Sequence, residues 1–146
     1  MDKKSIGNAV NFFVSKNGLN KREPKDMLEL ELDGVCEDKF KGKDISRSIL
    51  IVSQKSYEMA KQNNIKINNG ELGENILVNF DPYSLKSGTK LYIGNAIVEI
   101  SKKSTLCSSL SKVDNKLPKL LKDNRGIFAK VIEAGTINKN DIVELL

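Results

Sequence analysis

Short apolar runs separated by turn signals recur along the whole 146-residue chain, and they constrain its fold more than any other feature. The clearest run is 27–32, where leucines alternate with glutamates. This period of two predicts a strand with Leu28, Leu30 and Leu32 facing inward and the glutamates outward. The other runs that predict strands are 9–14, 48–52, 76–79, 89–93, 96–100, 127–132 and 141–145.

Helical signals are few by comparison. Ser53 is suited to cap a helix over about 54–63, with Tyr57 among the candidates for its buried side, and a second short helix is predicted over about 117–122. We find no internal repeat and no linker, so residues 1–146 are predicted to form a single domain. Many short strands with two or three short helices predict a mainly β fold, a closed or nearly closed β-barrel.

Charge and hydropathy exclude several classes of protein. The formal net charge of +5 comes mostly from lysine, and acidic residues are interleaved throughout. Because no arginine-rich or aromatic-basic stripe is present, nucleic-acid binding is not supported. No apolar run approaches the roughly 18 residues that span a bilayer, and the N-terminus lacks the apolar core of a signal peptide. We therefore expect a cytoplasmic protein with no membrane association.

Histidine and cysteine usage narrows the chemistry further. The chain has no histidine and two cysteines, Cys36 and Cys107. Two ligands are too few for a structural zinc site, and the absence of histidine excludes Ser-His and Cys-His nucleophiles as well as histidine acid–base catalysis. A reducing compartment argues against a disulfide between the two cysteines.

Cys107 is the candidate for reactive chemistry. It lies in the segment 101–109, rich in serine with two lysines, where nearby positive charge favours the thiolate. A thiolate there suits a soft metal or a persulfide. The alternative, equally compatible with the local sequence, is a small buried apolar side chain. Cys36 lies in a charged loop without hydroxyl residues, and we expect only an incidental role for it.

A glycine-bearing loop in the middle of the chain is the second candidate. Gly70 and Gly73 allow a tight bend that brings backbone N–H groups close to a ligand. Glu74 and Asn75 then stand at the mouth of a strand, where their side chains can point into whatever the sheet encloses. The alternative is an ordinary tight turn with Glu74 solvated.

Arginines are scarce, and two of them precede predicted strands. Arg47 and Arg125 could hold a phosphate or a carboxylate through paired N–H groups. The alternative for each is a surface salt bridge that contributes little.

The order of these pieces resembles the MOSC domain, named for the C-terminal domain of molybdenum cofactor sulfurases. The resemblance runs from about residue 9 to 146, and its most specific part is the Gly-Glu-Asn loop followed by a lone cysteine. The pieces that carry it are 34–42, 47–50, 70–76, 85–94, Cys107, 125–126 and 135–141.

The resemblance implies a MOSC-type barrel with a pocket for the molybdenum cofactor or a sulfur cargo. Cys107 matches the expected molybdenum ligand or sulfur carrier. Residues 73–75 match the loop that lines the pterin and metal pocket, and Arg47 and Arg125 match arginines that hold the cofactor's phosphate. The chain departs from the family's early loop motif, Gly-Asp-x-His-x-Gly, because Glu37 replaces the first glycine and Phe40 the histidine. It also has Leu106 where family members often have proline before the cysteine.

Three functional hypotheses follow. The first is a cofactor-binding or sulfur-carrying protein of molybdenum-cofactor metabolism, which receives sulfur from a pyridoxal-phosphate cysteine desulfurase or works with cofactor-biosynthesis proteins. The second is a molybdenum-dependent reductase of N-hydroxylated compounds; it needs a separate redox partner, because the chain has no iron–sulfur cysteines or flavin motif. The third is a non-catalytic barrel that binds another anion or a partner protein.

Overall fold

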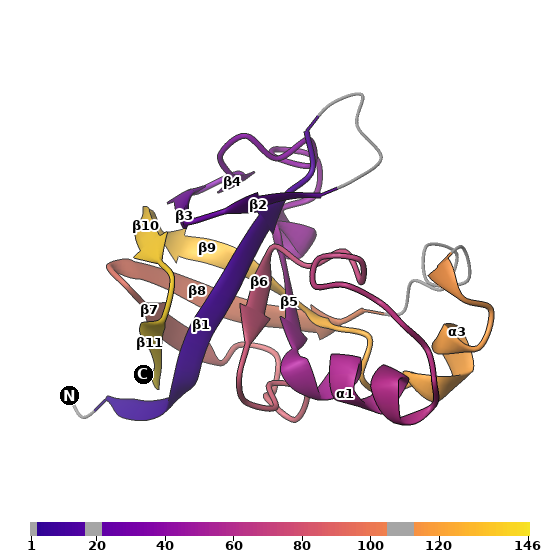
Figure 1. Ribbon diagram of the computed structural model, residues 1–146. Helices are drawn as coiled ribbons and strands as arrows, with labels where there is room; N and C mark the ends of the chain where they lie inside the picture. Colours follow the sequence, from indigo (N-terminus) through magenta and orange to yellow (C-terminus); the bar gives the residue numbers. More distant parts are fainter. Residues whose placement is uncertain (1–2, 17–21, 105–112) are drawn as a thin grey trace.

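A closed barrel forms the centre of the computed structural model, which describes residues 3–16, 22–104 and 113–146 (Figure 1). Around the barrel the strands are β1 (Lys4–Val14), β6 (Ile76–Val78), β5 (Ile49–Ser53), β9 (Ile127–Glu133), β8 (Ala96–Lys103), β7 (Lys90–Ile93) and β11 (Asp141–Leu145). Strand β11 pairs with both β7 and β1, which closes the ring. Only β5 and β6 pair in parallel among these neighbours. The prediction of a mainly β, closed barrel is confirmed.

Outside the ring, the described residues form four further short strands. Strand β2 (Glu23–Lys25) pairs with the end of β1, and β10 (Gly135–Asn138), β3 (Met27–Glu31) and β4 (Gly34–Val35) form a separate small sheet. The sequence pattern had indicated only β3 among these four. The inward orientation of Leu28 and Leu30 is confirmed, since each is 2% exposed. The prediction for Leu32 is wrong: β3 ends at Glu31, and Leu32 lies in the following turn at 62% exposure.

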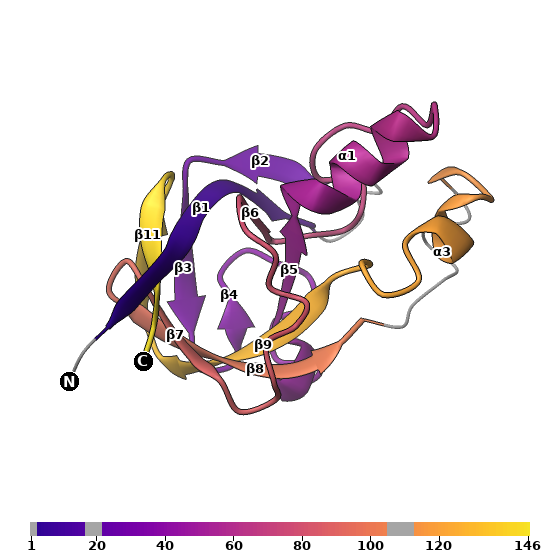
Figure 2. The ribbon, with the colours of Figure 1, turned by 90° about the horizontal axis from the view of Figure 1, so that it is seen from below.

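In the described part of the chain, two helices cover one side of the barrel. Helix α1 (Gln54–Gln62) follows β5 directly, and the Ser53 side chain accepts a hydrogen bond from the Lys55 N–H, as the predicted N-cap requires. Helix α3 (Leu117–Leu120) lies beside it on the same side of the molecule (Figure 2). Seven buried side chains form the layer between helices and barrel: Val52, Ala60, Ile65, Leu72, Leu77, Leu117 and Leu121.

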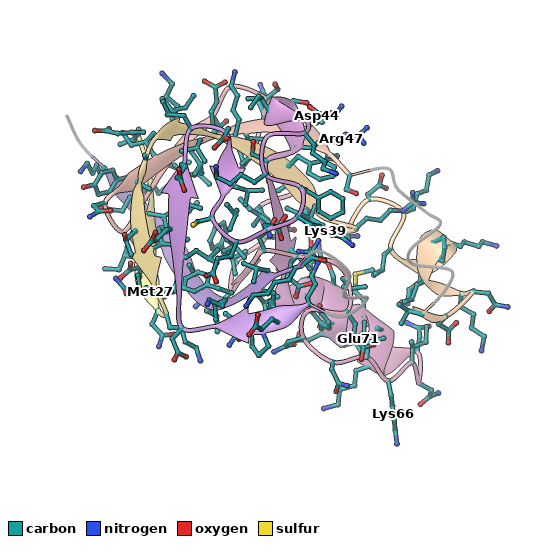
Figure 3. The ribbon with its side chains drawn as sticks, turned by 90° about the horizontal axis from the view of Figure 1, so that it is seen from above. Met27, Lys39, Asp44, Arg47, Lys66 and Glu71 are labelled. Carbon is teal, nitrogen blue, oxygen red and sulfur yellow. The ribbon has the colours of Figure 1, made fainter. Side chains whose placement is uncertain are left out.

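A single 3-10 turn, η1 (Ile45–Arg47), precedes β5. The Asp44 side chain caps it by accepting from the Ser46 N–H, and the Ser101 hydroxyl of β8 donates to the Ser46 carbonyl. These bonds fix the turn that presents Arg47, labelled in Figure 3. No helix in the part of the chain that the structure describes is long and apolar enough to cross a membrane.

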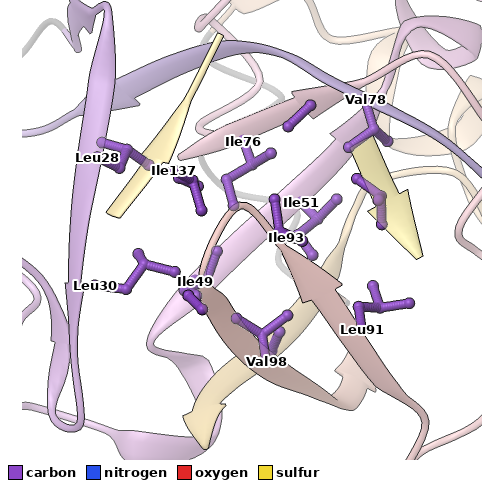
Figure 4. Close-up of a cluster of buried hydrophobic side chains, with 14 of the residues drawn as sticks. Leu28, Leu30, Ile49, Ile51, Ile76, Val78, Leu91, Ile93, Val98 and Ile137 are labelled. Atoms are coloured by element: carbon purple, nitrogen blue, oxygen red, sulfur yellow. The ribbon is translucent and has the colours of Figure 1, made fainter. Parts of the chain in front are cut away.

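Successive side chains of β5 point to opposite faces, so the strand lies between two apolar layers. Ile49 and Ile51 point into the barrel, where they meet side chains from almost every strand (Figure 4). Leu50 and Val52 point outward, toward the helices. Burying an aliphatic side chain of this size contributes about 1.5–3 kcal/mol before the entropy of ordering is subtracted. Strand β5 is therefore held firmly on both faces, and its outward face is a rigid platform.

Candidate functional site

The glycine loop is held by a buried carboxyl group. Gly70 and Gly73 both adopt positive φ, +93° and +92°, which folds the chain into a tight turn. Glu74 is 0% exposed, so the alternative with a solvated Glu74 is wrong. The Tyr57 hydroxyl lies 2.8 and 2.6 Å from the two carboxylate oxygens of Glu74, and the Gly70 N–H donates to one of them over 3.0 Å. Glu74 thereby ties the turn to helix α1.

Burial sets the protonation of this pair. Desolvation raises the pKa of Glu74, while hydrogen bonds from Tyr57, from its own N–H and from Gly70, and the charge of Arg22, oppose that rise. Burial, followed by the charge of Glu74, raises the pKa of Tyr57 far above its usual value. The phenol therefore stays protonated and donates to the carboxylate.

Asn75 joins three segments through its side-chain amide. Its Oδ1 accepts from the Leu50 N–H at 3.0 Å, and its Nδ2 donates to the Phe13 carbonyl at 3.2 Å and to Asp38 Oδ1 at 3.4 Å. Its backbone also bonds to Leu50 and to Phe13. At 4% exposure the amide is buried and fully engaged. Asn75 therefore fixes the position of the loop against β1 and β5.

Asp38 anchors the charged loop that precedes η1. Its buried carboxylate accepts from the Ser15 N–H at 2.7 Å and from the Phe40 N–H at 3.2 Å. Phe40 itself, in the place of the family's histidine, is 47% exposed. The loop is thus pinned from beneath while the Phe40 ring faces outward.

Arg22 is the functional candidate that sequence reasoning missed. Its side chain is only 16% exposed, and its nearest carboxylate oxygen is Asp38 Oδ1 at 3.6 Å. One terminal nitrogen, Nη1, is buried and has no hydrogen-bond partner among the described residues. Burial lowers the pKa of Arg22, and the charges of Asp38 and Glu74 oppose that change. The available signal was its rarity, since the chain contains three arginines.

Leu50 is close to one neighbour of each arginine: Gly73 beside Arg22, Gly126 after Arg125, and Phe128 beneath Arg47. A Cβ built on Gly73 would be 3.8 Å from the Leu50 side chain and 3.9 Å from Arg22 Nε. A Cβ on Gly126, the residue after Arg125, would be 2.7 Å from the Leu50 side chain. We call this surface, formed by Arg22, Arg47, Arg125, Gly73 and Leu50, the arginine face.

The other two arginines differ in how they are held. Phe128, the cross-strand partner of Leu50, has the Arg47 guanidinium 5.6 Å from its ring centroid. Arg47 is also 3.6 Å from an Asp44 carboxylate oxygen, and its side chain is 41% exposed. Arg125 donates to the Pro118 carbonyl at 2.8 Å, which ties it to α3. Seen from above, Lys39 lies between Arg47 and the exposed Glu71 in projection (Figure 3).

Cys107 lies outside the described residues. The chain on its N-terminal side ends at Ser104, whose N–H donates to the Gly126 carbonyl over 2.9 Å. The convergence of Cys107 with the arginine face stays a prediction.

Cys36 lies in different surroundings, on the small sheet. It borders a surface cavity of about 410 Å³ lined by Lys25, Met27, Leu28, Glu29, Cys36 and Glu37. Burial raises the pKa of Cys36, and a hydrogen bond to Glu31 and the charges of Glu31, Glu29 and Glu37 raise it further. The group therefore stays a thiol. Within the described residues, no three cysteine or carboxylate side chains gather as a metal site.

Solved structures share this architecture. The chain superposes on a crystal structure of the YuaD protein from Bacillus subtilis with a TM-score of 0.84 and 19% identity, over 99% of this chain and 98% of that one. YiiM from Geobacillus stearothermophilus matches with a TM-score of 0.70 and 15% identity, over 99% of this chain and 75% of that one. For YiiM from Escherichia coli the TM-score is 0.69 and the identity 16%, over 100% and 70% of the two chains. These likenesses establish the fold.

A comparison of the sequence with family models identifies the family. Residues 37–144 match the family model described as MOSC domain, which is well over half of the chain. No curated protein sequence is similar enough to be matched.

Proposed function

The chain belongs to the MOSC domain family, and on that premise we propose that it binds the molybdenum cofactor or carries sulfur for it, with the phosphate on the arginine face and Cys107 as soft ligand or sulfur carrier. The residues matched to the family include part of the charged loop, the glycine loop and two of the three arginines.

The observation that supports this proposal most directly is Nη1 of Arg22, which is buried without a hydrogen bond and lies 3.6 Å from Asp38 Oδ1. A buried donor without an acceptor costs about 1–3 kcal/mol, so this nitrogen calls for an acceptor from outside the described residues. Gly73 leaves room for a further atom beside the same guanidinium, since an added Cβ would lie 3.8 Å from the Leu50 side chain and 3.9 Å from Arg22 Nε. A phosphate oxygen satisfies both requirements, and guanidinium groups bind phosphate through paired N–H donors.

The residues of the proposed site would have different roles. Arg22 and Arg47 would hold the phosphate, while Arg125, fixed to Pro118, adds positive charge. Asn75 and Glu74 engage their polar atoms within the protein and would act by positioning the loop. A Cys107 thiolate suits molybdenum because soft metals prefer sulfur ligands. When bound, the cofactor would supply the metal-centred redox or sulfur chemistry.

Loading Cys107 with sulfur requires a protein that donates the sulfur. A pyridoxal-phosphate cysteine desulfurase carries a persulfide, and the Cys107 thiolate would attack its terminal sulfur. A new S–S bond then forms on Cys107, the donor's S–S bond breaks, and the donor leaves as its thiolate. No general base is required when the attacking group is the Cys107 thiolate, which the nearby lysines of the sequence favour.

Metal analysis and intact mass of protein purified from a cofactor-producing host test this proposal. We expect molybdenum bound in proportion to protein, or a gain of the mass of one sulfur after incubation with a desulfurase and cysteine. Cys107→Ser should abolish the signal, whereas the matched control Cys36→Ser should retain it. A Cys107→Ser protein that keeps both the full molybdenum content and the full sulfur gain would contradict the proposal.

A further inference from the structure

Glu74 is a buried acid whose charge compensation depends largely on one cation. Its carboxylate has no exposure to solvent. Tyr57 faces the carboxylate from α1. Burial raises the pKa of Tyr83 to about 12, and the charge of Glu74 contributes to this rise. Among the residues that the structure describes, Arg22 is the cation whose charge opposes the rise in the pKa of Glu74, and the same guanidinium lies 3.6 Å from Asp38.

An anion placed at Arg22 removes that compensation. The negative charge of the ligand would offset the guanidinium, and the buried Glu74 carboxylate would then face a net negative neighbourhood. Burying an uncompensated carboxylate is costly enough that such groups take up a proton instead. The Asp38 carboxylate already accepts from Ser15 and Phe40, so its charge is distributed over fixed donors.

The Tyr57–Glu74 contact accommodates the proton without rearrangement. The phenol oxygen is within 2.6 and 2.8 Å of the two carboxylate oxygens, so it can donate to one while the other carries the proton. The Gly70 N–H, 2.9 Å from the phenol oxygen, keeps an acceptor in either state. The turn that holds Gly73 beside Arg22 thus survives protonation.

We propose that binding of an oxyanion at Arg22 is coupled to uptake of about one proton by Glu74, so that the site holds its anion more tightly as the pH falls. This inference rests on the proposed function, because it assumes that the arginine face is an anion site. Glu74 has a lower pKa when Arg22 is free and a higher pKa when Arg22 holds an anion. By linkage, the association constant for the anion falls up to about tenfold for each unit of pH between these two pKa values.

Isothermal titration calorimetry with sulfate tests the coupling. Sulfate is a suitable probe because it stays a dianion through the neutral and mildly acidic range and so brings no titration of its own. Titrations in two buffers of different ionisation enthalpy report the protons taken up. We expect uptake approaching about one proton per sulfate within the titration window, and tighter binding at lower pH.

Two variants and one control identify Glu74 as the group that takes up the proton. Glu74→Gln keeps the size and the acceptor of the side chain, so it should bind sulfate at neutral pH as tightly as the wild type does at low pH, without proton uptake. Glu71→Gln, in the same turn but exposed, should behave as the wild type. Tyr57→Phe removes the donor to the carboxylate and should move the proton-uptake window to higher pH. Circular dichroism confirms that each variant is folded.

The outcomes separate the coupling from the site. Sulfate binding that is independent of pH in the wild type, or a pH dependence that persists in Glu74→Gln, overturns the coupling and leaves the anion site standing. Absence of sulfate binding that depends on Arg22, at every pH, overturns the anion site and the coupling with it.

Discussion

The arginine face and the Cys36 side of the small sheet both concentrate charge, but they do so in opposite ways. Around Cys36, half-buried lysines pair with exposed acids, as Lys25 does with Glu37 at 3.0 Å and Lys41 with Asp33 at 2.9 Å. On the arginine face, Arg22 is largely buried, and its nearest carboxylate is 3.6 Å away. The first arrangement satisfies its own charges, whereas the second leaves a donor that only a ligand or another segment can satisfy.

Burial is what separates the two regions. Exposed ion pairs contribute little, since water screens them and their long side chains lose freedom. A desolvated guanidinium interacts more strongly with every neighbouring charge, so Arg22 influences Asp38, Glu74 and Tyr57 together. A cysteine placed near Arg22 would therefore be favoured as a thiolate, whereas Cys36 among glutamates stays a thiol.

The largest expected effect comes from removing the side-chain amide of Asn75, which fixes the glycine loop against β1 and β5. Asn75→Ala deletes three side-chain hydrogen bonds and leaves buried groups of Leu50, Phe13 and Asp38 without their partner. We expect a loss of about 3 kcal/mol or more in the free energy of unfolding, measured by urea denaturation. The exposed Asn69→Ala in the same loop should change it by less than about 0.5 kcal/mol. Equal effects for the two variants would show that the amide network does not hold the loop.

The next prediction compares the buried Arg22 with Lys25 on the Cys36 side. Arg22→Gln should weaken sulfate or phosphate binding at least about tenfold, because a charge-assisted hydrogen bond contributes about 1.5–3 kcal/mol. Lys25→Gln, on the Cys36 side, should leave the affinity unchanged. Titration calorimetry at low salt measures both. If Lys25→Gln weakens binding as much as Arg22→Gln, general positive charge rather than the arginine face attracts the anion.

The smallest effect sharpens the description of Cys36. In a Cys107→Ser background, alkylation by iodoacetamide reports the Cys36 thiolate alone. Glu31→Gln removes a carboxylate that raises the pKa of Cys36, so the pH profile of the rate should move to lower pH and the rate at neutral pH should rise about two- to threefold. Glu133→Gln, an exposed change on β9, is the control. An unchanged profile in Glu31→Gln would remove that glutamate from the electrostatics of Cys36.

The sequence by itself determined the local elements: the strand β3 from its alternation, the strands β7 and β8 from their apolar runs, and helix α1 from its Ser53 cap. These follow from backbone and side-chain preferences that act between near neighbours. It also placed Glu74 and Asn75 at a strand mouth, but not the direction of their side chains.

Only the tertiary structure decided that Glu74 is buried against Tyr57, that Asn75 reaches Phe13 and Asp38, and that Arg22 lies beside Gly73. Those contacts join segments far apart in the chain. Which distant donor meets which acceptor depends on how the barrel closes, and no local pattern encodes the closure.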